Sequence, residues 1–456
     1  MQQIIKFIFP VLIVVVSTPL FLSAQNSSPN FIEKDPAQYG VPFKNVPDKR
    51  DVSLYQVNMR VFSKQGDFKG VLSRLDSIKA LGINVIYLMP IHPVGIVKTS
   101  NSPYCVKDYK AINAEFGSIK ELREIVEGAH KRKMAIILDW VANHTAFDNK
   151  WTVNKEWYQQ DSAGNIVSPA MGWNDVAQLN FNNAAMRLAM ISAMKYWVYA
   201  ANVDGYRCDY ADGPPLDFWK QAIDSLRHIA SHKLLFMAEG SRSENFNAGF
   251  DFNFGFRFFD DLKNIYAANR NVLSIDTLNK EDYKNATNGQ QIIRYITNHD
   301  VNSSDGTPLE LFGGVKGSLA AFTIVACMKG VPMIYGGQEV GTPIRLSFPF
   351  TSTKIDWTIN PGLTAIYKKI IGFRNSSPVI RRGTLTSFST PDICVFTKVL
   401  GKQKVLVLSN LRNASISYSI PSALNATRWT DVLNLHRIKI SKTIMLQPYS
   451  YLILRQ

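Results

Sequence analysis

Four short polar segments, each at the end of an apolar run of strand length or just after one, constrain the fold of this chain more than any other feature. Each segment carries at least one carboxylate, and a carboxylate beside a buried strand is costly unless it is paired or takes part in chemistry. Successive parallel strands bring their carboxyl ends to one edge of a sheet, so we expect these carboxylates to converge there. The runs are 135–138, 200–203, 234–237 and 292–296, and the segments are 139–144, 205–209, 237–240 and 297–300.

Strand-like and helix-like patterns alternate up to about residue 375. Apolar residues at helical spacing predict a helix over 67–81, and Ser118 with Glu121 forms a capping-box signature for a helix that ends near residue 132. Such alternation is typical of a parallel sheet covered on both faces, and carboxylates gathered at its strand ends are typical of a (β/α)8 TIM barrel. The other expected strands are 53–62, 84–89 and 332–335, and the other expected helices are 183–201, 216–231, 317–328 and 363–375.

Two parts of the chain break this alternation. Residues 145–180 contain turn residues and three tryptophans but no long helix, so we expect a short excursion, called domain B below, after the third strand. Beyond residue 379 the pattern changes to β-prone runs at 393–399, 404–408, 416–420 and 443–454, which indicate a separate antiparallel β domain. We therefore expect residues 25–377 to form the barrel domain, with domain B at about 145–180, and residues 378–456 to form the C-terminal β domain.

The first residues have the pattern of a secretory signal peptide. Lys6 precedes the almost wholly apolar stretch 7–22, and small residues end at Ala24, where we expect cleavage. A retained anchor helix is the alternative interpretation. With cleavage, the protein is expected to be secreted or periplasmic and to keep no membrane anchor.

Charge and cysteine content exclude several classes of function. The chain has 51 Lys and Arg against 36 Asp and Glu, a formal net charge of +15, but the basic residues are scattered and form no block of the kind that binds nucleic acid. Cys105, Cys208, Cys327 and Cys394 are widely spaced and include no CxxC pair. They are therefore expected to be buried thiols and not a disulfide framework or a metal cluster.

Acids at barrel strand ends, without a Cys/His metal cluster, fit glycoside hydrolysis with retention of configuration. That mechanism needs a carboxylate nucleophile and a carboxylic acid ~5 Å apart. Asp209 and Glu239, at the ends of the fourth and fifth strands, are the natural pair. Arg207 lies on the same strand face as Asp209, where its charge would keep Asp209 ionised, whereas Glu239 must hold its proton until it donates it.

The order and spacing of the four segments resemble the four signature regions of the alpha-amylase family, glycoside hydrolase family 13. The resemblance covers about residues 50–375 and extends to 102–109, 176–180 and 330–339. It implies that Asp209 is the nucleophile, Glu239 the general acid/base and Asp300 a third acid that binds sugar hydroxyls. It also implies supporting roles: Tyr104 stacks under the sugar, His144 and His299 hydrogen-bond to it, Arg207 orients the nucleophile, Asp139 braces the site, and Asn143 is a ligand of structural calcium in many members.

The chain also departs from the family pattern. Asp212 and Gly213 stand where many amylases have lysine and histidine. The sequence therefore does not decide whether the usual subsites on the leaving-group side are present or whether a structural calcium is bound. No cofactor is expected for the chemistry itself. Trp151, Trp157 and Trp173 fit sugar-stacking platforms and the core of domain B equally well.

The expected function is that of a secreted, monomeric, retaining hydrolase that cleaves α-1,4-glucosidic bonds of starch-type glucans or maltooligosaccharides. An exo-acting α-glucosidase, a maltogenic enzyme or a glucanotransferase of the same family is the alternative. A non-catalytic carbohydrate-binding member is a third hypothesis, but such members usually lack one of the three acids, and all three are present here.

Overall fold

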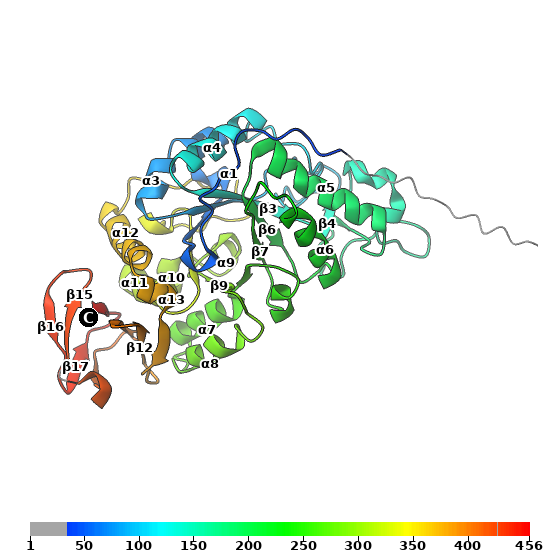
Figure 1. Ribbon diagram of the computed structural model, residues 1–456. Coiled ribbons are helices and arrows are strands. Elements are labelled where there is room, and N and C mark those ends of the chain that lie inside the picture. Colours follow the sequence, from blue (N-terminus) through cyan, green and yellow to red (C-terminus); the bar gives the residue numbers. More distant parts are fainter. Residues whose placement is uncertain (1–33, 426) are drawn as a thin grey trace, which may run out of the picture.

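Eight parallel strands close into a barrel, which confirms the expected fold class (Figure 1). The computed structural model describes residues 34–425 and 427–456, so the expected signal peptide lies outside the described residues. The strands are largely buried, as the near-continuous apolar runs predict, and every residue of β3 is buried. In sequence order they are β1 (Leu54–Val57), β2 (Val85–Leu88), β3 (Ala135–Val141), β6 (Gly205–Asp209), β7 (Leu235–Ala238), β8 (Phe252–Phe254), β9 (Gln291–Arg294) and β10 (Val331–Tyr335).

Helices surround the barrel and bury their apolar faces against it (Figure 1). The capping box predicted at Ser118 is present: its side chain accepts from the helix backbone, and Glu121 reaches back to the Ser118 N–H. None of the helices in the described part of the chain combines the length and hydropathy that crossing a membrane requires. The longer helices are α3 (Leu75–Ala80), α4 (Ile119–Lys131), α5 (Ala184–Ala201), α6 (Leu216–Arg227), α7 (Phe256–Ala267), α8 (Ser274–Glu281), α11 (Gly314–Cys327) and α12 (Pro361–Ser376).

Several element boundaries differ from those that the sequence predicts. The expected strand 53–62 stops at Val57, and its second half forms the short helix α1 (Met59–Phe62). The expected helix 67–81 is two helices, α2 (Phe68–Leu72) and α3, separated at Ser73 and Arg74. The apolar run 200–203 is not a strand, because α5 extends to Ala201 and Asn202 ends it in the left-handed conformation, with φ at 59°. The fourth barrel strand is the segment 205–209 itself.

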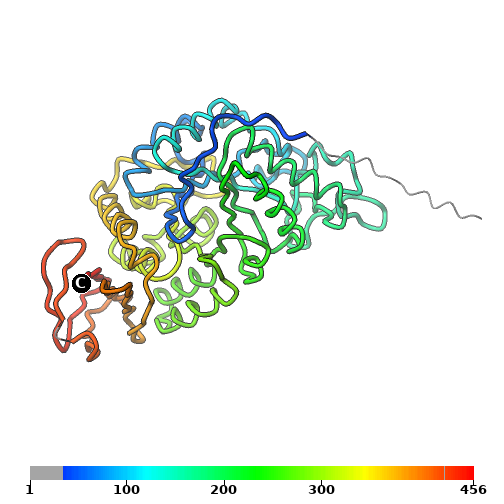
Figure 2. Tube along the Cα trace, viewed as in Figure 1, coloured from blue at the N-terminus to red at the C-terminus, as the bar shows by residue number. Residues whose placement is uncertain are grey.

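Domain B is a short excursion between β3 and α5. Its two strands, β4 (His144–Ala146) and β5 (Val176–Gln178), pair antiparallel and set His144 opposite Gln178. The 3-10 helices η2 (Lys150–Val153) and η3 (Lys155–Trp157) lie between them. The excursion projects from the barrel next to α5 (Figure 2).

The C-terminal part forms antiparallel sheets beside the barrel (Figure 2). The run 443–454, expected as one strand, is divided between two sheets. Lys398 joins this part to the barrel side: its buried ammonium donates to the carbonyl oxygens of Met328, at 2.9 Å, and Ile380, at 2.6 Å. The six-stranded sheet contains β11 (Thr384–Ser387), β12 (Ile393–Leu400), β13 (Gln403–Asn410), β18 (Tyr451–Arg455), β15 (Arg428–Asp431) and β16 (Arg437–Lys439), and β14 (Ile416–Ser419) pairs with β17 (Thr443–Leu446).

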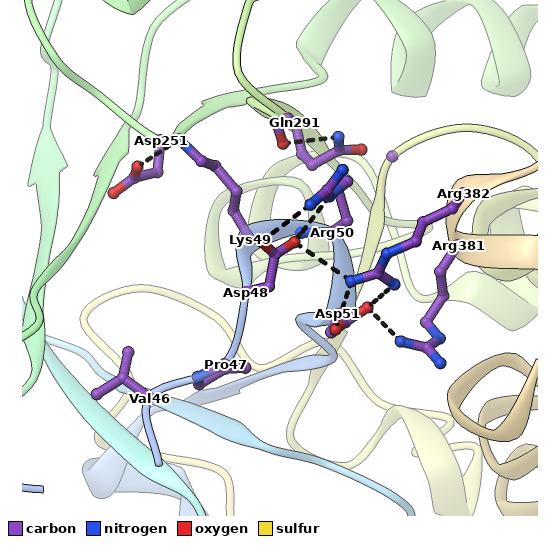
Figure 3. Close-up of polar contacts among 12 residues, drawn as sticks. Val46, Pro47, Asp48, Lys49, Arg50, Asp51, Asp251, Gln291, Arg381 and Arg382 are labelled. Carbon is purple, nitrogen blue, oxygen red and sulfur yellow. Dashed lines mark hydrogen bonds and ion pairs between the residues drawn. The ribbon is translucent and has the colours of Figure 1, made fainter. Parts of the chain in front are cut away.

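An ion-pair network ties the segment before β1 to the helix that leads into the C-terminal sheets (Figure 3). Asp51 accepts from Arg381 and Arg382, both on α13 (Pro378–Arg382). Lys49 Nζ lies 3.1 Å from Asp251 Oδ1, just before β8. Because its carboxylates have partners on distant elements, the network holds the amino-terminal segment, the barrel and α13 together.

Replacement of Asp51 by Asn should destabilise the fold in a pH-dependent way. Burial alone would raise the pKa of Asp51, but hydrogen bonds from Arg382 and Arg381 outweigh it and lower the pKa, while the hydrogen bond from Arg50 lowers the pKa of Asp48 to about 2. Carboxylates with lowered pKa stabilise the fold above their unfolded pKa, ~3.9, and this contribution is lost as the pH falls through the folded pKa. At pH 7 we expect Asp51→Asn to lower the Tm by roughly 2–4 °C.

Thermal unfolding of wild type and variant at pH 7 and pH 3 tests this. The difference in Tm between wild type and Asp51→Asn should be smaller at pH 3 than at pH 7. Asp76→Asn is the matched control, because it breaks a pair with Arg132 in which the Asp76 side chain is 82% exposed. If Asp51→Asn lowers the Tm by no more than Asp76→Asn does, or if its effect on the Tm is larger in acid, the stabilising role of the Asp51 ion pairs is wrong.

Candidate active site

Strand register brings the predicted residues to one cleft at the carboxyl ends of the barrel strands. Asp139 on β3 is paired in register with Arg207 on β6, and Cys208 on β6 with Ala238 on β7, so Asp209 and Glu239 follow at adjacent positions. The cleft has a volume of about 370 Å³. Its lining includes six of the predicted site residues, Tyr104, His144, Asp209, Glu239, His299 and Asp300.

The Arg207 guanidinium is buried beneath this cleft and contacts three carboxylates. Its Nη1 lies 2.6 Å from Asp139 Oδ1 and 3.1 Å from Asp209 Oδ1, and its Nη2 contacts Glu239 Oε1. The sequence predicts a single Arg207–Asp209 pair, whereas the structure divides one positive charge among three acids. Because three ionised carboxylates would leave an excess of two negative charges in a buried site, the cluster favours retention of a proton.

The pKa shifts follow from this shared charge. Burial raises the pKa of Asp209 well above its usual value, the negative charge of Glu239 raises it further, and Arg207 offsets only part of the rise. Burial also raises the pKa of Asp139, to about 6, against the opposing effect of Arg207. Three buried acids that share one guanidinium can together hold one proton, which a nucleophile and a proton donor need between them.

A chain of hydrogen bonds fixes the tautomer of His299. Gln56 Nε2 lies 2.8 Å from His299 Nδ1, so Nδ1 accepts and Nε2 carries the proton. His299 Nε2 lies 2.7 Å from Tyr104 Oη, and the Tyr104 hydroxyl donates to Asp139 Oδ2 at 3.0 Å. The Tyr104 and His299 rings are also stacked, with centroids 5.4 Å apart. The two rings thus form a rigid wall of the cleft.

Both histidines of the cleft are neutral. Burial lowers the pKa of His299 to about 3 and that of His144 to about 4. They therefore serve as hydrogen-bonding groups and not as acids. Asp300 differs from the other acids because its side chain is 59% exposed toward the cleft and lies 3.2 Å from His299 Nε2. Asn298 sets its position by capping helix α9 (His299–Ser304) and accepting from the Asp300 N–H at 3.0 Å.

The structure adds residues that sequence reasoning missed. Gln56 and Tyr87 are polar residues on buried barrel strands, and Tyr87 donates to Asp139 Oδ2 at 2.5 Å. An inward polar residue on an otherwise apolar strand was the available signal. Trp173 lines the cleft, whereas Trp157 is buried and Trp151 packs against Trp157. Of the three tryptophans, Trp173 is thus placed to contact a sugar, and the other two belong to the core of domain B. The remaining lining residues are Ser100, Ser102, Asp175, Val176, Tyr210, Phe348 and Phe350.

The surroundings of Asn143 do not suit calcium. Gln178 Nε2 donates to the Asn143 main-chain oxygen at 3.0 Å, and Asn143 Nδ2 donates to Gln178 Oε1 at 3.3 Å. Calcium prefers several oxygen ligands that include carboxylates, but here the candidate oxygens are neutral and already accept from amides. Among residues 34–425 and 427–456, no group of three or more His, Cys, Asp or Glu side chains is placed to hold a metal ion.

All four cysteines are buried free thiols, as their spacing predicts. Burial raises the pKa of Cys105, Cys327 and Cys394 to about 12, so these thiols are unreactive at neutral pH. The cysteines therefore take no part in the chemistry of the cleft.

Known proteins resemble the chain in sequence and in fold. The family model for the alpha-amylase catalytic domain matches residues 39–165. The chain is 26% identical to Alpha-amylase 3 of Dictyoglomus thermophilum, over 90% of this chain and 94% of that protein. It is 23% identical to a cyclomaltodextrin glucanotransferase of Paenibacillus macerans, over 81% of this chain and 58% of that protein.

Solved structures share the fold. A maltogenic alpha-amylase, AmyB from Thermotoga neapolitana, superposes with a TM-score of 0.79 at 23% identity, over 89% of this chain and 99% of that one. An alpha-amylase from Lactobacillus plantarum gives a TM-score of 0.80 at 24% identity, with the same coverage. The matched family model, the relatives and the solved structures agree, and together they support the alpha-amylase family of glycoside hydrolases for this chain.

Proposed function

We propose that this enzyme hydrolyses α-1,4-glucosidic bonds of soluble starch-type glucans and maltooligosaccharides, with retention of anomeric configuration. The observation that carries the proposal is the placement of Asp209 and Glu239 at adjacent register positions on one guanidinium. Neighbouring strands lie ~4.8 Å apart. That spacing suits the ~5 Å separation of a retaining pair and is shorter than the ~6.5–9.5 Å that inverting enzymes need to admit a water molecule.

In the first step, Asp209 attacks the anomeric carbon while Glu239 gives its proton to the departing glycosidic oxygen. This step requires that the proton retained by the carboxylate cluster be on Glu239 and that Asp209 be the anion beside Arg207. The C–O bond to the leaving sugar breaks, and an ester bond forms between Asp209 and the remaining sugar.

In the second step, Glu239 accepts a proton from water, which attacks the same carbon and releases Asp209. Two displacements at one carbon restore its original configuration. The neutral His144 and His299 and the exposed Asp300 supply hydrogen-bond partners for the hydroxyls of one sugar ring. Tyr104, fixed by His299 and Asp139, offers an aromatic face to that ring.

The substrate class follows from these groups and from the relatives. The similar proteins are named as amylases, a glucanotransferase and a cyclomaltodextrinase. Transfer to a second sugar in place of water, or action at chain ends, uses the same pair of carboxylates, so product analysis distinguishes these alternatives. The signal-peptide pattern in residues 1–24 supports action outside the cytoplasm, where the enzyme would act as a monomer.

Early reaction products should keep the α configuration, and Asp209→Asn should abolish turnover. Loss of the nucleophile is expected to lower kcat at least about 10³-fold because no glycosyl ester can form. The measurements are proton NMR of products from maltotetraose and initial rates on soluble starch, maltose and a β-1,4-glucan. Asp224→Asn is the control, because Asp224 forms an exposed helical pair with Lys220. A β-configured initial product, or a comparable rate on the β-glucan, would overturn the proposal.

Glu239→Gln should lose activity on maltooligosaccharides but keep much of the first step on α-maltosyl fluoride. Fluoride leaves without a proton, so only the sugar leaving group needs the general acid, whose contribution is ~10²–10⁴-fold. Hydrolysis of the glycosyl ester still needs a base, and added azide should therefore accelerate turnover. A burst of fluoride release followed with and without azide tests this assignment. Equal losses on both substrates would place the proton donor elsewhere.

We further propose that the Asn143–Gln178 amide pair holds the junction between domain B and the barrel without calcium. Chelator or millimolar calcium should then leave the wild-type Tm unchanged, while Gln178→Ala should lower it equally in both conditions. Loss of these hydrogen bonds leaves the buried Asn143 amide unsatisfied, which costs about 1–3 kcal/mol. Gln178→Asp adds a carboxylate beside Asn143, and we expect the Tm of this variant to rise when calcium is added. A calcium-dependent Tm in the wild type would refute this proposal.

A further inference from the structure

Asp212 lies between the two loops that carry the predicted catalytic carboxylates. It is three residues beyond Asp209, in the loop after β6, and it faces the loop that follows Glu239 after β7. At this position the sequence departs from the lysine of many amylases. Its side chain is 25% exposed, so it is neither a fully solvated surface group nor a core residue.

Four hydrogen bonds from the second loop saturate the Asp212 carboxylate. Oδ2 accepts from the Ser241 N–H at 2.8 Å and from its hydroxyl at 3.2 Å. Oδ1 accepts from Arg242 Nε at 3.1 Å and from Asn245 Nδ2 at 3.0 Å. Because both oxygens are occupied by protein donors, Asp212 has no free acceptor to offer a sugar hydroxyl.

Arg242 connects the same two loops in the opposite direction. Its Nη2 donates to the carbonyl oxygen of Ala211 at 2.7 Å and to that of Pro214 at 3.2 Å, on either side of Asp212. Asn253 on β8 anchors the assembly to the barrel, because its Nδ2 donates to the Arg242 carbonyl at 2.9 Å. The contacts form a closed, charge-assisted clasp between loop 210–215 and loop 239–245, supported by a third strand.

The clasped loops also contact Glu239 directly. The Tyr210 N–H donates to Glu239 Oε2 at 2.9 Å, and the Ala211 N–H donates to the Glu239 carbonyl at 2.8 Å. Tyr210 adopts a left-handed φ of 40°, which an L-residue keeps only when its surroundings hold it there. The two loops approach so closely at Gly240 that a Cβ there would lie 2.3 Å from Asp212 Oδ1.

We propose that Asp212 is a positioning residue that, through its clasp with Arg242 and Ser241, holds the Glu239 carboxyl at its working distance from Asp209. The proposal rests on the retaining mechanism proposed above. The barrel fixes the strands, and Arg207 on β6 contacts Glu239 Oε1, but the Glu239 side chain extends past the strand end, where the Tyr210 N–H of the clasped loop holds its Oε2. Weakening of the clasp releases the Tyr210 N–H from Glu239 and lets the acid move relative to the leaving oxygen.

Leaving-group dependence distinguishes this role from a general loss of stability. Asp212→Asn keeps the size of the side chain and the contacts of Oδ1 but removes the acceptor for both Ser241 donors. A misplacement of ~1 Å can cost ~10²-fold in rate. We therefore expect kcat on maltotetraose to fall roughly 30–100-fold, with less than about a threefold change in the burst rate of fluoride release from α-maltosyl fluoride, because fluoride departs without the acid. KM should change less than about threefold on both substrates.

Two further variants complete the experiment. Asp217→Asn is the matched control on the same βα unit: it breaks an ion pair with Arg187 in which Asp217 is 68% exposed, and it should leave both rates unchanged. Arg242→Lys removes the contacts to Ala211 and Pro214 while keeping a positive charge, and it should reproduce the selective loss if Asp212→Asn does not fold. The double variant should lose less than the product of the single losses.

The outcomes separate this proposal from the proposed function. Equal losses in kcat on maltotetraose and in the burst rate of fluoride release, or no loss in either, would overturn the positioning role of Asp212. Inversion of configuration or absence of hydrolysis by the wild type would instead overturn the retaining mechanism, whatever Asp212 does.

Discussion

The contact of one buried guanidinium with three carboxylates is the interaction on which the site depends. Arg207 is almost wholly inaccessible to solvent and joins Asp139, Asp209 and Glu239 from three consecutive barrel strands. Burial of so many charges would be prohibitive without mutual pairing. Their pairing leaves negative charge in excess, and in the mechanism that we propose a proton retained by the cluster is the one that Glu239 donates to the leaving oxygen.

The barrel supports this cluster by fixing positions that no local interaction could hold. Adjacent register sets the spacing of Asp209 and Glu239, and the inward residues Gln56 and Tyr87, which are register partners on β1 and β2, orient His299 and Asp139. Loops complete the site where the strands end. Domain B contributes His144 and Trp173, the segment after β10 contributes Phe348 and Phe350, and the Asp212–Arg242 clasp restrains the acid. The strands therefore set the positions of the main site residues, and hydrogen bonds between loops restrain the side chains that extend beyond the strand ends.

Sequence patterns predicted most of the frame and the central residues. Carboxylates at the ends of apolar runs marked Asp139, Asp209, Glu239 and Asp300, and the alternating patterns predicted the barrel. The errors have local causes. β8 spans three residues, too short for a periodic signal, and the run 200–203 is apolar because it ends a buried helix, not because it forms a strand. Glycine and asparagine at left-handed positions decide such boundaries, and their effect depends on the chain around them.

The sequence by itself determined which acids lie at strand ends and in what order, because a buried strand tolerates a carboxylate only where it is paired or used. Only the tertiary structure decided how those acids share charge and protons. Hydrogen bonds such as Tyr104–His299 and Asp212–Arg242 join residues 195 and 30 positions apart. No periodicity encodes such contacts, since they exist only after the barrel has closed and brought the loops within about 3 Å of one another.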